Sequence, residues 1–275
     1  MNYRMLGYVL GRIFMVEAAL LLPPSIVAVI YGEWSCLFAF VVTAVGLAVL
    51  GLVLGLRSPA NSAIYAREGL VIVALAWVLM SVFGALPFII SGDIPFFVDA
   101  FFETVSGFTT TGASVLKDVE AISRGLLFWR SFTHWLGGMG ILVFLMALEP
   151  SSRGSGFALH VMRAESPGPA VGKLVPKISQ TAKILYGIYI VFTLVEIIAL
   201  LITGMSPFEA MTLTFGTVGT GGFGVLNDSI ASYSLASQIV ITTFMIICSI
   251  NFNVYYLLLI RKTKEAFMNQ ELRYY

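Results

Sequence analysis

The sequence predicts an all-α polytopic membrane protein with six transmembrane helices and two shorter re-entrant half-helices, each followed by an extended strand. Of its 275 residues, 58% are hydrophobic and only 11% are charged, whereas soluble domains carry roughly 25% charged residues. Six apolar segments approach the roughly 20 residues that a helix needs to cross a bilayer. Two similar Gly/Thr-rich stretches, too short and polar to cross, lie between such segments.

We expect the six spans at roughly 6–30, 36–56, 69–91, 124–148, 183–204 and 235–260. The half-helices are expected at about 97–108 and 207–216, each in the gap between two spans. Basic residues before the first apolar segment resemble a signal peptide, but this segment runs on to about Tyr31 without a small-residue cleavage site. A retained first span is therefore expected.

The distribution of Lys and Arg predicts the orientation, because cytoplasmic loops are enriched in these residues. Three basic residues fall on or near one side, namely Lys117, Arg124 and Arg130. The other thirteen fall on the opposite side: Arg4, Arg12, Arg57, Arg67, Arg153, Arg163, Lys173, Lys177, Lys183, Arg261, Lys262, Lys264 and Arg273. We expect both termini to be cytoplasmic.

The two Gly/Thr-rich stretches form an internal repeat. The pairs Asp99/Glu209, Ala100/Ala210, Thr104/Thr214, Thr110/Thr220 and Gly112/Gly222 are each separated by 110 residues. A constant offset between two matching stretches indicates duplication of a large unit. A Thr/Gly-rich loop is usually only a turn, but two copies in register between spans favour a functional segment.

Irregular backbone at membrane depth is tolerated where it lines a water-filled path. Backbone carbonyls and Thr hydroxyls can replace the water shell of a potassium ion, and a helix C-terminus adds partial negative charge. The candidate filter residues are Thr109, Thr110, Thr111, Gly112, Gly219, Thr220, Gly221 and Gly222. Ser206, Pro207 and Glu209 predict the start of the second half-helix by a capping box.

The fourth span has unusual polar and small residues. Gly137, Gly138 and Gly140 permit close approach of a neighbouring backbone, as expected for a helix against a pore loop. Arg130 either extends toward the outer interface or pairs with Glu103 or Asp99 and braces the pore helix. His134 is interpreted as a packing residue.

Other polar residues have structural interpretations. Glu17, in the first span pair, requires an interhelical partner or a protonated carboxyl, and we favour a structural contact. Asn251 and Asn253 are expected to tie helices together, with an ion-facing role as the alternative. Cys36 and Cys248 lie in apolar runs, so neither a disulfide framework nor a metal site is predicted.

Several motifs together resemble the Trk/Ktr/HKT superfamily of potassium transporters. They are Thr109-Thr110-Thr111-Gly112, Gly219-Thr220-Gly221-Gly222-Phe223, the run from Trp129 to Gly140, the loop Arg163–Pro169 and the segment Asn251–Tyr256. The last three are similar to bacterial TrkH-like membrane subunits. The resemblance covers the whole chain and implies potassium uptake across the bacterial cytoplasmic membrane, with K⁺ as the transported ion and no bound cofactor.

Relatives of this kind carry an extra helix pair and four pore repeats, dimerise in the membrane, and are regulated by a TrkA-like cytosolic nucleotide-binding subunit. Here two repeats are present. The resemblance therefore implies either the N-terminal half of a longer protein or a split form needing a partner chain that supplies two more repeats. Gly112 and Gly222 imply preference for potassium.

The expected division is an accessory helix pair (1–60), a first repeat (61–150), a cytoplasmic linker (151–182), a second repeat (183–262) and the start of a further link (263–275). The linker could also dock a soluble regulator. An enzyme is not expected, since the chain shows no nucleophile–base arrangement. No nucleic-acid partner is predicted. The alternative to ion conduction is a non-conducting structural or assembly subunit with a channel-like fold.

Overall fold

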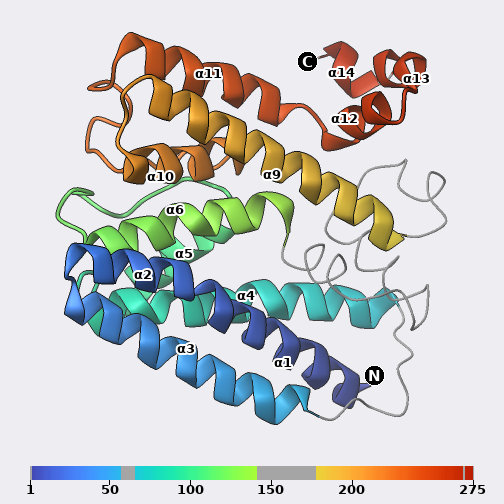
Figure 1. The fold of residues 1–275 in the computed structure, drawn as a ribbon. Helices are drawn as coiled ribbons and strands as arrows, with labels where there is room; N and C mark the ends of the chain where they lie inside the picture. The colour runs from blue at the N-terminus through green and yellow to red at the C-terminus, as the bar shows by residue number, and fades with distance from the viewer. Residues whose placement is uncertain (1, 57–65, 141–177, 269, 275) are drawn as a thin grey trace.

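The computed structural model describes residues 2–56, 66–140, 178–268 and 270–274. The ordered elements within these ranges are all helices (Figure 1). They are α1 (Tyr3–Leu20), α2 (Leu22–Tyr31), α3 (Trp34–Gly55), α4 (Ala66–Ser91), α5 (Phe97–Phe108), α6 (Arg124–Met139), α9 (Ile178–Ile202), α10 (Pro207–Val218), α11 (Leu235–Ser249), α12 (Phe252–Leu259), α13 (Thr263–Phe267) and α14 (Gln270–Tyr274).

Four segments of the described chain are long and apolar enough to cross a membrane: Tyr3–Tyr31, Trp34–Gly55, Glu68–Ser91 and Lys183–Ile202. A fifth is counted if α11 and α12 form one broken span. The predicted span 124–148 coincides with α6 as far as Met139, and most of its remainder lies outside the described residues. The chain is thus a multi-pass helical membrane protein, and the count of six spans stays a prediction.

The first and last predicted spans are interrupted. The first is divided at Leu21, two positions before the pair Pro23 and Pro24, because proline cannot donate the backbone hydrogen bond of a helix interior. The last was predicted as one helix over 235–260, which is wrong, since α11 and α12 meet at an angle of 82°.

The bend between α11 and α12 has a local cause. Ile250 is extended (ψ 135°), and the Asn251 side chain accepts a hydrogen bond from the Asn253 backbone N–H as the N-cap of α12. Asn251 Nδ2 also donates to Glu271 Oε2 at 2.7 Å. Asn251 therefore starts a new helix and ties it to α14, which agrees with its predicted packing role.

The two half-helices are present as α5 and α10, which agree with the predicted ranges 97–108 and 207–216 within two residues. Each has twelve residues, and their first residues, Phe97 and Pro207, are 110 positions apart. Ser206 caps α10 by accepting from the Glu209 N–H, with Pro207 at the first position. Helix α10 thus begins at the N-cap that the sequence predicts.

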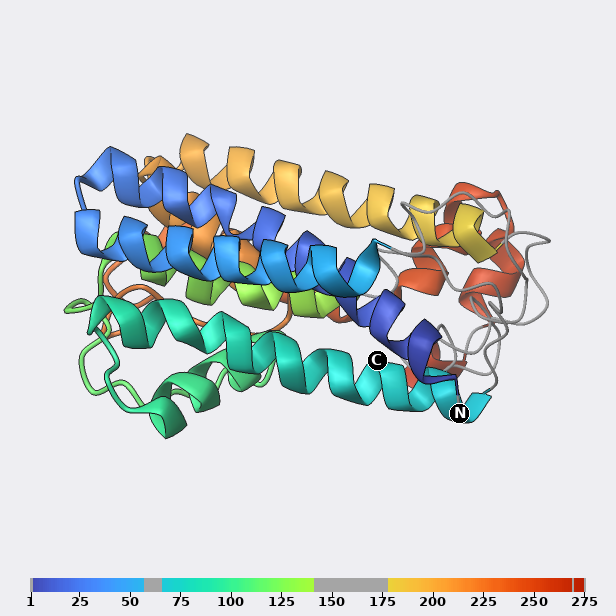
Figure 2. The ribbon, with the colours of Figure 1, turned by 90° about the horizontal axis from the view of Figure 1, so that it is seen from below.

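The helices run side by side in a bundle with α5 and α10 in the half away from the N-terminus (Figures 1 and 2). The N-terminus and α12–α14 lie at the same end of the bundle (Figure 1). The main apolar core joins α1 to α6 and also takes in Phe208 and Phe215 of α10. The two repeats therefore share one core at α6 and α10.

Candidate functional site

The chain follows the same path after α5 and after α10. Thr110 and Thr220 have φ angles of 54° and 58°, and Gly112 and Gly222 have 73° and 82°. Positive φ is uncommon for non-glycine residues and a genuine outlier for β-branched ones. Its presence at the same two places in both copies is the structural counterpart of the sequence repeat.

The backbone hydrogen bonds of these turns repeat as well. The N–H of Thr110 donates to Gly107 O and that of Thr220 to Thr217 O, both at 3.0 Å. Likewise, Thr111 N donates to Ser106 O and Gly221 N to Gly216 O, both at 2.9 Å. In each copy, the N–H groups that follow the short helix thus donate to the free carbonyl groups of its last turn.

The carbonyl groups that follow have a different status. Among the hydrogen bonds of the described chain, none ends on a carbonyl oxygen of residues 109–112 or 219–222. Thr109, Thr111, Thr220 and Gly222 are exposed. Backbone carbonyls inside a protein normally accept a hydrogen bond. The carbonyl oxygens of these two segments accept none within the described chain, so they are available as ligands at the C-terminal ends of two helices.

The two segments approach each other at Gly112 and Gly221. A Cβ atom added to Gly112 would collide with the Gly221 carbonyl oxygen, whereas one added to Gly222 would meet no heavy atom within 4 Å. Gly112 therefore lacks space for a side chain and also has a strained φ for other residues. Gly222 has space for a side chain, and only its positive φ favours glycine.

Helix α6 lies against both segments through adjacent glycines. A Cβ on Gly137 would clash with Phe108 O and come within 3.0 Å of Thr110 Cγ2. A Cβ on Gly138 would lie 2.8 Å from Gly219 Cα and 2.7 Å from the Tyr189 hydroxyl oxygen. The predicted close packing of this helix is present and involves the segments after both α5 and α10.

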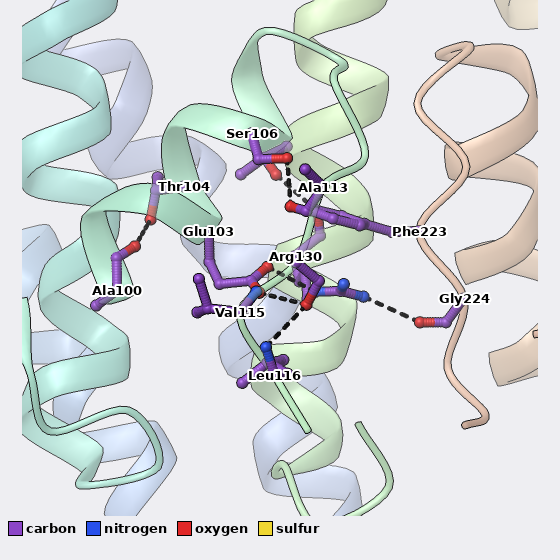
Figure 3. Close-up of polar contacts among 12 residues, drawn as sticks. Ala100, Glu103, Thr104, Ser106, Ala113, Val115, Leu116, Arg130, Phe223 and Gly224 are labelled. Atoms are coloured by element: carbon purple, nitrogen blue, oxygen red, sulfur yellow. Dashed lines mark hydrogen bonds and ion pairs between the residues drawn. The ribbon is translucent and has the colours of Figure 1, made fainter. Parts of the chain in front are cut away.

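Arg130 of α6 bridges the two copies (Figure 3). Its Nε donates to Glu103 Oε2 at 3.1 Å, and its Nη1 donates to Gly224 O at 3.0 Å. Arg130 and Glu103 are 4% and 1% exposed. The pairing partner is thus Glu103 of α5 and not Asp99, and the alternative in which Arg130 extends toward the interface is not observed.

Glu103 holds the chain that follows the first copy. Its Oε1 accepts from the Val115 N–H at 2.8 Å and from the Ser114 hydroxyl. Ser106 Oγ donates to Ala113 O at 2.6 Å, also from α5 to this chain. Glu103 therefore links α5, the segment after Gly112 and Arg130.

Phe223, directly after the second copy, is enclosed between two α6 side chains. Arg130 Cζ lies 3.5 Å from its ring centroid, and the His134 ring stacks on it at 3.9 Å. A cation over an aromatic face is attracted by the ring quadrupole. His134 is therefore a packing residue, as predicted, and Phe223 is a contact that sequence reasoning missed.

The second copy lacks its own version of this brace. The positions 110 residues after Glu103 and Arg130 are Leu213 and Val240. Neither can form an ion pair, and the chain after the second turn instead contacts Arg130 of the first repeat through Gly224 O. The two backbone turns are thus duplicated, whereas a single Arg130–Glu103 pair contacts both repeats.

The two remaining acidic candidates lie in the first turns of their helices. Asp99 is half-buried at the start of α5, where a carboxylate is favoured by the helix dipole. Glu209 is bonded to Ser206 Oγ at 2.5 Å and accepts from the Tyr233 hydroxyl at 3.1 Å. Glu209 thus joins the start of α10 to the chain before α11.

The loops beyond the two copies are joined by Asn227. Its side chain accepts from the Val119 N–H and donates to Asp118 Oδ1, both at 2.8 Å, and its N–H donates to Glu120 Oε1 at 2.9 Å. The Asn227 amide lowers the pKa of the Asp118 carboxyl below its ordinary value. These hydrogen bonds hold the loops together away from α6.

A cavity of about 310 Å³ lies beside the second copy, where residues of α10, the turn and α11 face one another. It is lined by Gly216, Thr217, Thr220, Gly221, Met245 and Ser249, among others. Within the described ranges, no group of three His, Cys, Asp or Glu side chains could hold a metal ion. Oxygen ligands from backbone and Thr are the candidate cation ligands.

Of the two alternatives expected for Glu17, an interhelical partner is not observed among the described residues. Its side chain is fully buried, and neither carboxyl oxygen has a hydrogen-bond partner in the described part of the chain. Glu196 of α9 has the same properties and was not singled out from the sequence.

The apolar helices and the duplicated short-helix turns define a multi-pass membrane protein of the transporter class. Residues 37–274 match the TrkH family of cation transport proteins. The chain therefore belongs to the TrkH family, whose members are transporters and not enzymes.

Several relatives are potassium uptake proteins. The Trk system potassium uptake protein TrkH of Halomonas elongata is 35% identical, covering 93% of this chain and 53% of the relative. That of Escherichia coli is 33% identical, covering 97% and 56%. The crystal structure of the potassium transporter TrkH from Vibrio parahaemolyticus superimposes with a TM-score of 0.78 at 30% identity, covering 93% and 52%. The chain thus spans about half the length of these relatives.

Proposed function

We propose that this chain contributes two of the four strands of a potassium-selective filter to an uptake system of the bacterial cytoplasmic membrane. The observation that carries the proposal is the pair of matching turns, Thr109–Gly112 and Gly219–Gly222, with open carbonyl oxygens after two short helices. The family membership supports cation transport, and the names of the relatives support potassium.

In this proposal, K⁺ binds at the carbonyls of Thr110, Thr111, Gly112, Thr220, Gly221 and Gly222, with help from the Thr hydroxyls. The oxygens replace the water shell of the ion. The C-terminal ends of α5 and α10 add partial negative charge nearby. Arg130 and Glu103 keep the two segments at a fixed separation, and Asp99 and Glu209 stabilise the helix starts.

The finer organisation is part of the same proposal. The chain crosses the membrane six times with both termini in the cytoplasm, in the units 1–60, 61–150, 151–182, 183–262 and 263–275. The shared end of the N-terminus and α12–α14 supports this topology (Figure 1). The two repeats act together with two further repeats, in an assembly that forms a homodimer and binds a TrkA-like cytosolic regulator.

The experiment is Rb⁺ flux into liposomes, with Na⁺ as competitor. Because a carbonyl ring takes four strands in tetrameric channels, the purified chain alone should give no selective flux, and the chain together with two further repeats should. Selective flux by the chain alone would refute the division into two strands. Wild-type flux when Gly112→Ser and Gly222→Ser are combined would instead favour a non-conducting subunit.

A further inference from the structure

The turn between α2 and α3 lies on the N-terminus of α6. Glu33 Oε1 accepts a hydrogen bond from the Arg124 N–H at 2.7 Å, and Glu33 Oε2 accepts from the Gly125 N–H at 2.9 Å. The first N–H groups of a helix have no partner within the helix. The carboxylate of an accessory-pair residue therefore caps a helix about 90 positions further along the chain.

Helix α6 has no cap from its own sequence. Ser123, at the N-cap position, makes no side-chain hydrogen bond to α6. Instead, its N–H and hydroxyl donate to Asp93 Oδ2 at 3.0 and 2.6 Å. Two carboxylates from outside α6 thus hold its first turn, and each also complements the positive end of the helix dipole.

The same turn reaches the second pore helix. The Arg124 guanidinium lies 5.8 Å from the Tyr31 ring and 5.1 Å from the Phe208 ring. Tyr31 and Phe208 also meet edge to face at 5.6 Å. Because Phe208 is the second residue of α10, the accessory pair contacts the start of α10 as well as that of α6.

Gly125 explains how the elements come so close. A Cβ atom at this position would lie 2.9 Å from Cys36 Sγ and 3.1 Å from Ala28 Cβ. Residues of α2 and α3 therefore pack directly on the first turn of α6. Their position fixes that end of α6 independently of the filter contacts further along it.

We propose that Glu33 is a positioning residue for ion selectivity, and that the accessory helix pair sets the filter geometry by capping α6. The inference rests on the proposed function, because α6 carries Arg130, Gly137 and Gly138 against the two filter segments. A loosened first turn lets α6 shift, and both filter segments then lose their common support.

The first test is independent of transport. Hydrogen–deuterium exchange is measured on the first-turn peptide of α6 for wild type, Glu33→Ala and Glu33→Gln in the complete assembly. Loss of a cap predicts roughly five-fold faster exchange for Glu33→Ala. Glu33→Gln retains an acceptor and should change exchange less. Glu265→Ala, at an exposed acid paired with Lys262, is the control. Unchanged exchange in Glu33→Ala would overturn the proposed cap.

The second test measures K⁺ uptake with Na⁺ as competitor. Glu33→Ala should lose K⁺ over Na⁺ preference, Glu33→Gln should restore most of it, and Asp93→Ala, which loosens the same turn, should resemble Glu33→Ala. Reduced protein amount alone lowers the maximal rate and leaves the ion ratio unchanged. A wild-type ratio in Glu33→Ala overturns the inference, whereas a non-selective wild-type assembly overturns the proposed function instead.

Discussion

Arg130 and Phe223 are separated by 93 positions in the sequence, yet the guanidinium carbon of Arg130 lies 3.5 Å from the centroid of the Phe223 ring. The same guanidinium pairs with Glu103 and binds Gly224 O. One side chain of the first repeat thus touches helix α5 of its own repeat and the chain after the Gly219–Gly222 turn of the next. This side chain therefore joins the two repeats.

Replacement of Arg130 by Met should destabilise the protein by about 3 kcal/mol, because it leaves the Glu103 carboxylate buried without its partner. Arg130→Lys should also lose uptake, since one ammonium cannot reproduce the two-directional contact of a guanidinium. Thermal unfolding in detergent and K⁺ uptake measure the two effects.

Glu103→Gln combined with Arg130→Met should be more stable than Arg130→Met alone, because the unpaired charge is removed. Lys264→Ala, at an exposed position of α13, serves as the control. Equal stability of the single and double variants would show that the ion pair is not what holds the two repeats together.

Gly112 and Gly222 should respond unequally to substitution. Gly112→Ser should reduce K⁺ over Na⁺ preference, and Gly222→Ser should weaken K⁺ uptake. The Gly112 variant should be the less stable of the two. Both variants place a side chain at a residue with positive φ, but only the side chain at position 112 also collides with the Gly221 carbonyl. Gly46→Ala, in α3 with nothing within 4 Å of the new Cβ, is the control. The measurements are K⁺ uptake in competition with Na⁺ and the midpoint of thermal unfolding. Wild-type values in both variants would show that these glycines are not part of the filter.

Gly137→Ala and Gly138→Ala should each impair uptake by pushing α6 away from one filter segment. Overpacking of this kind typically costs about 1–3 kcal/mol. Gly137→Ala acts on Thr110, and Gly138→Ala acts on Gly219. Gly7→Ala in α1, where the added Cβ is unobstructed, is the matched control. Normal uptake with an unchanged unfolding midpoint would mean that α6 does not support the filters.

The membrane helices and both short helices could be predicted from the sequence because their signals are local. Apolar runs mark the spans, and Ser206 with Pro207 marks the start of α10. The bend at Asn251 could not be predicted, since no Pro or Gly interrupts the run and the contact of Asn251 with Glu271 joins two separate helices. Its only sequence signal was an Asn inside an apolar segment.

The site was predictable only in its repeated part. The offset of 110 residues located both Thr/Gly-rich turns, but positive φ at Thr110 and Thr220 runs against the preference of β-branched residues. The contacts of Arg130 with Phe223 and of Glu33 with α6 join positions far apart in the sequence. Single-sequence patterns carry no information on such contacts. Whether Arg130 pairs with Glu103 or with Asp99 could be decided only from the structure.

The proposed topology predicts which positions are accessible from each side. Lys117→Cys, in the exposed loop after the first filter segment, should react with a membrane-impermeant thiol reagent added outside intact cells. Lys264→Cys of α13 should react only after the cells are opened. The two native cysteines, Cys36 and Cys248, are buried and should give little background. Labelling of Lys117→Cys only from the cytoplasmic side would reverse the proposed orientation.

We propose that the segments Thr109–Gly112 and Gly219–Gly222 coordinate the transported ion. Anomalous diffraction from crystals of the complete assembly grown with Rb⁺ in place of K⁺ tests it most directly. We expect an anomalous peak between the carbonyl oxygens of the two segments, and loss of that peak in Gly112→Ser. Rb⁺ peaks located elsewhere along the ion path of a transport-competent assembly, with none at these oxygens, would contradict it.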